Sequence, residues 1–289
     1  SSCVSSPISD LSPKAQAIAK YIDNLSDNKI EVPMLPDVAN QVLALSNDPD
    51  SDAAQLAKLI QSDQALAGHV MRIANSAAYT PNASMVSLQQ AVARLGLSLI
   101  TEIALAASLN TKIFKAPTYE NRINEIWDHA LCTAFWGKEV ARVAKKNVEA
   151  AFLCGLLHSI GKPVILQTIF DYSEWHDVSI SLDEVGVIES AYHVKYGEVV
   201  VRKWKMPAIV QESVHYYADY QNAQSNRDQA MVTNGAAKLA QAMLSGEEAA
   251  IDTALQDTVF ADLNLYEDEL ELLKERHDIV KSGLEAIRS

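Results

Sequence analysis

Apolar residues recur at intervals of three and four positions along most of this chain. That spacing is the period of an amphipathic α-helix, whereas a half-buried strand would alternate at every second residue. The first such segment follows Ser12 and Pro13, a pair typical of a helix N-terminus, and its apolar face carries Ile18, Tyr21, Ile22 and Leu25. Because this helical spacing dominates the chain, we predict an all-α fold.

Capping residues and helix breakers divide the helical pattern into blocks. Segments 87–90 and 181–184 are capping boxes that mark helix starts, and Gly96 is typical of a helix end. Pro117 interrupts the pattern between two long helical stretches, so a seam between two lobes is expected there. The predicted organisation is a disordered lead-in at 1–11, an N-terminal helical lobe at 12–116, a second helical lobe at 117–245 and a C-terminal helical extension at 246–289.

The C-terminal extension repeats apolar positions in alternating threes and fours. This is the a/d pattern of a coiled coil, but it lasts under three heptads, at Leu270, Leu273, His277, Val280, Leu284 and Ile287. One interpretation is a terminal helix that packs on its own body, and the other is the seam of a homodimer. We favour the first, because so short a pattern is typical of packing within one chain.

Composition disfavours several classes of protein. With 289 residues, 48% of them hydrophobic, the chain can bury a sizeable core as one large domain or two small ones. Its formal net charge of −13 disfavours nucleic acid as a partner, because phosphate contacts need lysine and arginine. The three cysteines match no metal-binding or redox spacing, which suits a reducing cytoplasm.

The chain also lacks the patterns of a targeted or membrane-bound protein. No apolar run reaches the roughly 18 residues that are needed to span a bilayer. Residues 1–9 have neither the positive charge nor the apolar core of a signal peptide. We therefore expect a cytoplasmic protein without a membrane partner.

Four of the seven histidines carry the candidate chemistry: His129, His158, His193 and His215. Imidazole is a common ligand of zinc, iron and nickel, and helix faces in a bundle can hold several such side chains around one ion. A hydrolase with two metals also needs carboxylates, which bridge the ions and neutralise their charge. For any single histidine, the competing interpretation is a partly buried side chain with a structural role.

The N-terminal half contains a series of blocks that together resemble a known family. The blocks are LP at 35–36, DPD at 48–50, LAKLIQSD at 56–63, RIANSAAY at 72–79 and SLQQAVARLG at 87–96. In this order and spacing they resemble the HDOD domain, the HD-related output domain of bacterial signalling proteins. The resemblance extends over about residues 32–243.

The central part resembles the wider HD superfamily of metal-dependent phosphohydrolases. The matching residues are Trp127-Asp128-His129, the segment 152–162, and the block formed by His193, Gly197, Trp204 and Pro207. Residues 156–162 read LLHSIGK, where an active relative has LLHDIGK. The resemblance implies an HD-like helical bundle with an additional N-terminal helical lobe, and it places His129, His158 and His193 at the positions of metal ligands.

The carboxylates that the resemblance calls for are missing. Ser159 stands at the position of the metal-binding aspartate, and a hydroxyl supplies neither its charge nor its coordination. The late aspartate of active enzymes falls on Asn234 or Ala237, depending on the alignment. A His-His pair of related sequences falls on Tyr217-Ala218 when counted without a gap, two residues after His215.

Three neutral imidazoles leave the charge of a divalent cation uncompensated, so His129, His158 and His193 are predicted to form a vestigial metal site. We expect no cofactor, with a residual zinc, nickel or iron ion as the alternative. The carboxylates that would compensate its charge by proximity are Asp128, Asp177 or Asp219.

The function implied by the resemblance is a non-catalytic signal-transduction module rather than an enzyme. It would bind signalling proteins in trans or a nucleotide-like ligand in the old cleft, where His158, Ser159 and Lys162 are the candidate contacts. Lys162 would meet a phosphate there, or else remain a solvated lysine. The alternative function is a metal-dependent phosphohydrolase, phosphodiesterase-like, with an altered metal site.

Overall fold

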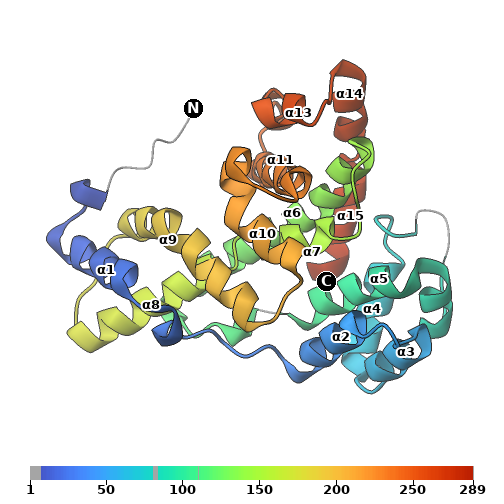
Figure 1. Cartoon of the computed structure of the whole chain (residues 1–289), viewed down its shortest axis with the longest axis horizontal. Coiled ribbons are helices and arrows are strands. Elements are labelled where there is room, and N and C mark those ends of the chain that lie inside the picture. Colours follow the sequence, from blue (N-terminus) through green and yellow to red (C-terminus); the bar gives the residue numbers. More distant parts are fainter. Residues whose placement is uncertain (1–7, 81–83, 110, 289) are drawn as a thin grey trace.

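The computed structural model describes residues 8–80, 84–109 and 111–288. Every regular element within these residues is a helix, so the predicted all-α fold is confirmed (Figure 1). The α-helices are α1 (Pro13–Asn24), α2 (Asp37–Asn47), α3 (Ala53–Gln61), α4 (Gln64–Ala74), α5 (Leu88–Ser108), α6 (Glu120–Val143), α7 (Ala151–Leu157), α8 (Gly161–His176), α9 (Leu182–Lys203), α10 (Ala208–Tyr216), α11 (Arg227–Ser245), α12 (Ala250–Ala254), α13 (Thr258–Asp262), α14 (Glu267–Glu275) and α15 (His277–Arg288). Short 3-10 helices are η1 (Ile8–Asp10), η2 (Asp27–Lys29), η3 (Thr111–Ile113), η4 (Pro117–Tyr119) and η5 (Tyr217–Asn222).

The predicted start and stop signals act where the sequence places them. Ser181 begins α9 with a capping box that Glu184 closes, and Ser87 caps α5 by accepting a hydrogen bond from the Gln90 amide. Gly96 has φ of +86°, a conformation that favours glycine, and it breaks α5 into two helical parts. These contacts are local along the chain, which is why the sequence predicts them.

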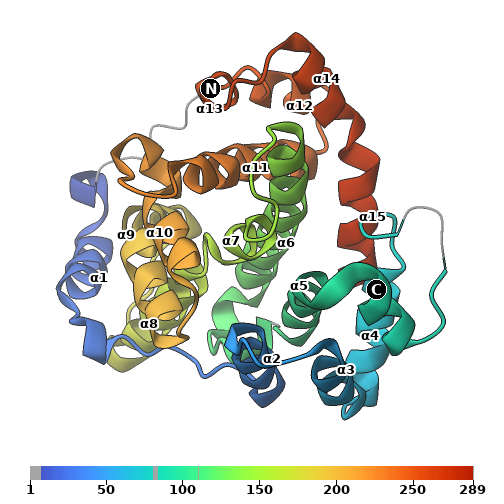
Figure 2. The same cartoon turned by 45° about the vertical axis from the view of Figure 1, so that its right-hand side comes forward.

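Two groups of helices make up the body of the protein. In the first group, α2, α3 and α4 pack against α5. In the second group, α6 packs against α7 and α11, while α8 packs against α9, and α10 lies against α7, α9 and α11. Figure 2 shows the first group at the lower right and the second group at the left and centre. The seam predicted at Pro117 corresponds to η4, which lies between α5 and α6.

The first helix packs with the second group, so the N-terminal lobe predicted at 12–116 is not one packed unit. α1 lies against α8 and α9, apart from α2 to α5 (Figure 2). The Tyr196 hydroxyl donates to the Ile22 carbonyl at 2.9 Å, and the Trp204 indole N–H donates to the Pro33 carbonyl at 2.9 Å. The hydrophobic pattern of α1 predicts a buried face, but it does not say which helices cover that face.

The disordered lead-in predicted at 1–11 is wrong for its last residues. Ile8–Asp10 forms η1, which contacts α1, and Leu11 is buried in the core. Residues 1–7 lie outside the described part of the chain.

A buried ion pair joins the two groups of helices. Lys138 of α6 lies 3.4 Å from the Glu102 carboxylate of α5, and both side chains are almost fully buried. The Lys138 ammonium also lies 3.8 Å from the centre of the Tyr79 ring. Burial raises the pKa of Glu102 to about 7, against the opposing effect of Lys138, and burial lowers the pKa of Lys138. Removing either partner would leave the other charge buried and uncompensated.

The C-terminal extension packs on the chain's own body, as we favoured from its short heptad pattern. α14 lies against α6, and α15 lies against both α6 and α4. Val280 and Leu284 of α15 are buried within this chain, and Arg288 pairs with Asp128 of α6 at 2.9 Å. The heptad positions do not form one continuous helix, because α14 ends at Glu275 and α15 begins at His277.

Two helical stretches are long and apolar enough to cross a membrane by length and composition alone, although the sequence analysis expected none. They are Leu88–Ser108 and Ala151–His176. Half of the apolar window in the first and 83% of that in the second are buried inside the protein. Such burial is typical of core helices, so this is weak evidence for a membrane segment.

The helices α8 and α9 come into backbone contact near the start of α8. A Cβ atom on Gly161 would lie 2.0 Å from the carbonyl oxygen of His193 and 2.5 Å from the amide nitrogen of Gly197. Both neighbours are backbone atoms, so they cannot rotate away. Only glycine fits at position 161.

We therefore predict that Gly161→Ala lowers the free energy of unfolding by about 3 kcal/mol, because the added methyl group forces the two helices apart. The matched control is Gly186→Ala in α9, where no atom lies within 4 Å of the added Cβ. That change is expected to raise stability by about 0.5–1 kcal/mol, since glycine is unfavourable inside a helix. Urea unfolding followed by circular dichroism measures both, and equal effects would contradict the packing argument.

Candidate functional site

Three helical elements bring the predicted histidines together. His129 comes from α6, His158 from the turn between α7 and α8, and His193 from α9. The ring centres of His129 and His158 lie 5.3 Å apart. All three side chains are largely withdrawn from solvent. These three histidines are therefore neighbours, and their assignment as a vestigial metal site stays a prediction.

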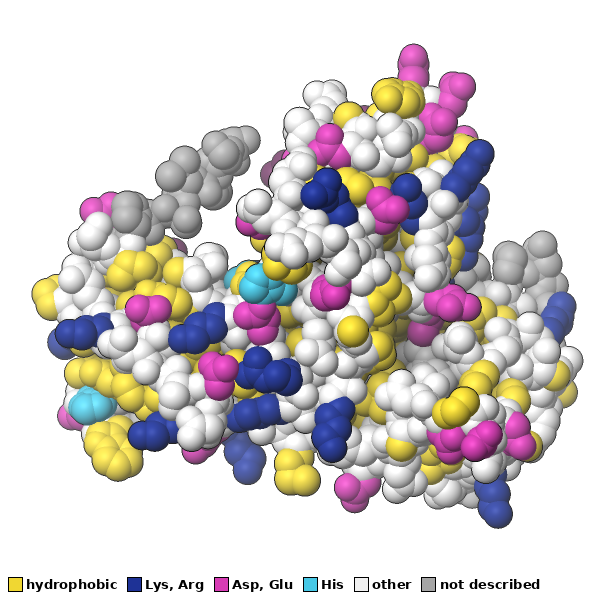
Figure 3. Space-filling view, viewed as in Figure 1, with side chains coloured by type: hydrophobic (Ala, Val, Ile, Leu, Met, Phe, Trp, Pro, Cys, Tyr) yellow, Lys and Arg dark blue, Asp and Glu magenta, His cyan; other side chains and the backbone are white. Residues whose placement is uncertain are grey.

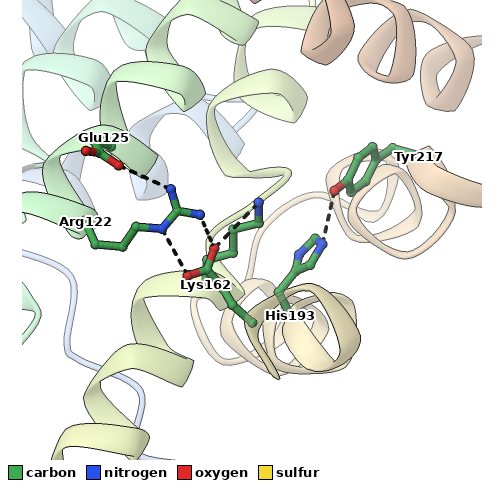
Figure 4. A network of polar contacts seen from close by, with 6 residues as sticks. Arg122, Glu125, Lys162, His193 and Tyr217 are labelled. Carbon is green, nitrogen blue, oxygen red and sulfur yellow. Dashed lines mark hydrogen bonds and ion pairs between the residues drawn. The ribbon is translucent and has the colours of Figure 1, made fainter. Parts of the chain in front are cut away.

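Tyr217 fills the space between two of these histidines. Its ring lies edge-on to His158, with ring centres 5.0 Å apart, and its hydroxyl lies 3.3 Å from Nε2 of His193. Figure 4 shows the tyrosine hydroxyl directed at the His193 ring. When the His-His pair of related sequences is counted along the chain without a gap, its first position falls on Tyr217. The structure places Tyr217 beside the histidine cluster.

His215, the fourth histidine that the sequence singled out, is not part of the cluster. It lies on α10, is partly exposed, and forms an ion pair with Glu198 of α9. Tyr217 follows His215 by two residues, and only Tyr217 belongs to the cluster.

Backbone carbonyl groups occupy one ring nitrogen of His129 and one of His158, whereas Nδ1 of His193 is buried without a partner among the described residues. Nε2 of His129 lies 3.0 Å from the Ala237 carbonyl oxygen, and Nδ1 of His158 lies 2.6 Å from the Gly155 carbonyl oxygen. A carbonyl oxygen only accepts hydrogen bonds, so each of these nitrogens carries the proton. That nitrogen has no lone pair for a metal, whereas the other nitrogen of each ring, Nδ1 of His129 and Nε2 of His158, keeps its lone pair.

Burial keeps these imidazoles neutral. Burial, together with a smaller contribution from the nearby Lys162 ammonium, lowers the pKa of His129 to about 4 and the pKa of His193 to about 3. The pKa of His158 also falls well below its usual value, first through burial and then through His129. Each shift disfavours the charged imidazolium, mainly because burial removes the ring from water.

The two positions where carboxylates were expected hold other groups. Ser159 is 2% exposed, and within the described part of the chain its hydroxyl has no hydrogen-bond partner. Asn234 donates to the Tyr217 carbonyl at 2.8 Å, while its own side-chain oxygen is buried and meets no partner among the same residues. Both candidate positions for the late aspartate, 234 and 237, adjoin the cluster, but neither brings a carboxylate.

The three aspartates proposed to compensate a metal's charge have other contacts or lie elsewhere in the fold. Asp128 is turned to Arg288, and Asp219 accepts a hydrogen bond from Asn222. Asp177 caps the end of α8, the opposite end from the cluster. Across residues 8–80, 84–109 and 111–288, no group of three or more His, Cys, Asp or Glu side chains is arranged to hold a metal. The donor set present here does not fit the metals of the HD superfamily.

A network of charged side chains adjoins the histidine cluster. Glu189 of α9 is 1% exposed and accepts two hydrogen bonds from Arg122, at 2.7 and 3.3 Å. The Lys162 ammonium lies 3.8 Å from the same carboxylate (Figure 4). Arg122 also pairs with Glu125 at 3.3 Å. Burial lowers the pKa of Lys162, whereas Glu189 acts to raise it.

A pocket of about 600 Å³ opens beside this network. The residues that matter for its chemistry are Arg122, Asp128, His129, Ser159, Lys162 and Arg288. The buried Ser159 hydroxyl and the partly exposed Lys162 lie on its wall, so two of the three predicted ligand contacts line one cavity. His158, the third, lies behind this wall in the histidine cluster.

The sequence did not reveal Arg122, Glu189 or Arg288 as parts of this region. Arg122 and Glu189 lie 67 positions apart, and Arg288 lies 160 positions from Asp128. None of the three belongs to a motif that was recognised in the chain. The LLHSIGK motif identified Lys162 as a candidate ligand contact, but it does not predict that Glu189 lies beside this lysine.

The chain matches proteins whose fold is known. Residues 32–220 match the HDOD domain. An HDOD domain protein of unknown function from Geobacter sulfurreducens is 18% identical, with a TM-score of 0.68, and the match covers 96% of this chain and 98% of that one. A candidate metal-dependent phosphohydrolase from Shewanella amazonensis SB2B is 21% identical, with a TM-score of 0.71, over 93% of this chain and 98% of that one.

A relative known from its sequence is longer than this chain. It is an uncharacterized protein of Treponema pallidum (strain Nichols), 20% identical over 242 residues, which are 79% of this chain and 45% of the relative. This chain thus spans about half the length of that protein. At these identities the solved structures establish the fold alone, an HD-like helical bundle with additional N-terminal helices. The match over residues 32–220, which is more than half of the sequence, shows that the chain belongs to the HDOD family.

Proposed function

We propose that this protein is a non-catalytic regulatory module that acts by binding, and that it has lost the phosphohydrolase activity of HD enzymes. The observation that carries this proposal is the position of Tyr217, whose ring lies between His158 and His193. Burial raises the pKa of Tyr217 well above its usual value, so its side chain stays a neutral phenol between the two histidines. It cannot replace the charge of a missing metal-binding carboxylate.

Membership in the HDOD family supports a regulatory role for the chain. A candidate signal transduction protein from Marinobacter aquaeolei VT8 shares the fold, with a TM-score of 0.63 and 21% identity over 95% of this chain and 65% of that one. We propose that the pocket beside Lys162 and Ser159 is the binding surface for a small ligand or a segment of a signalling protein. Its arginine and lysine side chains can meet phosphate or carboxylate groups.

We predict that the purified protein contains no stoichiometric metal and hydrolyses neither nucleotides nor cyclic dinucleotides when Mg²⁺, Mn²⁺, Fe²⁺ or Zn²⁺ is added. The reason is that no carboxylate neutralises an ion at the cluster. Elemental analysis and chromatography of the nucleotides measure the two results. A stoichiometric metal that disappears in His158→Ala but persists in the control His277→Ala, an exposed histidine on α15, would favour the phosphohydrolase instead.

We also predict that the protein loses stability as the pH falls from about 6.5 to about 4. The folded state holds the pKa of His129 near 4 and that of His193 near 3, below the ordinary value of 6.5, so the unfolded chain binds more protons in this window. Each histidine that differs by a full proton contributes a slope of about 1.4 kcal/mol per pH unit.

Urea unfolding at several pH values tests this expectation. His193→Gln should make the free energy of unfolding depend less steeply on pH than it does in the parent protein. The matched control is His277→Gln, which removes an exposed imidazole that contacts none of these residues. If both variants keep the slope of the parent, the histidine cluster is not the buried neutral group that the structure describes.

A further inference from the structure

A second pocket lies at the other end of α8, about 20 Å along the helix from Lys162. It has a volume of about 390 Å³, and we call it the aromatic groove. The residues that define it are Tyr21, Glu31, Asp171, Tyr172, Trp175 and His176. Apolar side chains gather over the outer end of α8 on the face shown in Figure 3. None of these residues belongs to the candidate site beside the histidine cluster.

Aromatic rings form one side of the groove and remain open to solvent. Trp175 is 86% exposed and Tyr21 is 43% exposed, although tryptophan and tyrosine normally bury most of their surface. Tyr172 links the row, with its ring centre 5.1 Å from that of Tyr21 and 4.1 Å from that of His176. Exposed aromatic rings of this kind carry much of the binding energy in protein interfaces.

Two carboxylates lie in the same groove without a cation between them. Glu31 and Asp171 both line it, and within the described parts of the chain neither forms an ion pair. Partial burial raises the pKa of Asp171 first, and the nearby Glu31 raises it further, so the two negative charges act on each other. Lys29 also lines the groove but is paired with neither of them. A cation placed between the carboxylates would relieve their repulsion.

We propose that the aromatic groove docks an arginine side chain from a basic segment of a partner protein. A guanidinium group is planar, so it stacks on the face of Trp175 while its N–H groups donate to Asp171 and Glu31. A lysine ammonium is a compact charge that gains less from stacking. This interaction is separate from binding in the pocket beside Lys162.

The test uses the full chain and a short blocked Gly/Ser peptide that carries one arginine, at physiological ionic strength. Acrylamide quenching of tryptophan fluorescence reports mainly on Trp175, because acrylamide reaches exposed rings most easily. Trp175 is exposed, whereas Trp136 and Trp204 are buried and Trp127 is partly buried. Bound peptide should shield Trp175 and reduce the quenching. The same peptide with lysine should bind several-fold more weakly, and the peptide with uncharged citrulline should not bind.

Variants of the groove test the two halves of the proposal separately. Asp171→Asn should weaken binding by about tenfold, which is the loss of one charge-assisted hydrogen bond. Trp175→Ala should abolish it when binding is measured by calorimetry. The matched controls are Asp50→Asn and Leu182→Ala, which alter an exposed carboxylate and an exposed apolar side chain elsewhere, and both should bind as the parent does.

Four results would overturn the proposal. The first is no binding of the arginine peptide, and the second is equal binding by the arginine and lysine peptides. The third is unchanged binding in both groove variants. The fourth is a parent protein that sediments as a dimer and becomes a monomer on Trp175→Ala, which would make the groove a contact between two copies of this chain. Because none of these measurements involves the pocket beside Lys162, they leave the proposed function independently testable.

Discussion

The backbone contact between α8 and α9 at Gly161 determines the geometry of the whole candidate site. The His193 carbonyl oxygen occupies the place where any other residue at position 161 would carry its Cβ atom. This contact holds the turn that bears His158 and Ser159 against the helix that bears His193. The glycine of the LLHSIGK motif therefore has a structural role of its own, because it sets how closely two core helices approach.

Buried imidazoles without a metal need other partners, and the chain supplies them from its backbone and from one tyrosine. The Ala237 and Gly155 carbonyl groups accept from His129 and His158, and the Tyr217 hydroxyl meets His193. These bonds engage one nitrogen of each neutral ring, while Nδ1 of His193 stays buried without a partner among the described residues. A charged ring in the same place would cost more, because burial removes its charge from water. The cluster has thus the chemistry of a hydrogen-bonded core, while the charged residues beside it line an open pocket.

Long-range contacts then tie the rest of the molecule to this core. The segment from α1 to Pro33 lies against α8 and α9, the Glu102–Lys138 pair joins the two helix groups, and α15 lies across α4 and α6. The helix α8 has the pocket beside Lys162 at its start and the aromatic groove at its end, so it contributes residues to both proposed binding surfaces.

The sequence by itself determined the helical class, the caps at Ser87 and Ser181, the break at Gly96 and the nearness of the three histidines. Those features depend on residues a few positions apart, or on motifs whose spacing the fold preserves. Only the tertiary structure decided that α1 packs with the second group of helices, that Glu189 lies beside Arg122 and Lys162, and that Trp175 stays exposed. These outcomes depend on which amphipathic faces meet, and a hydrophobic pattern marks a buried face without naming the helix that covers it.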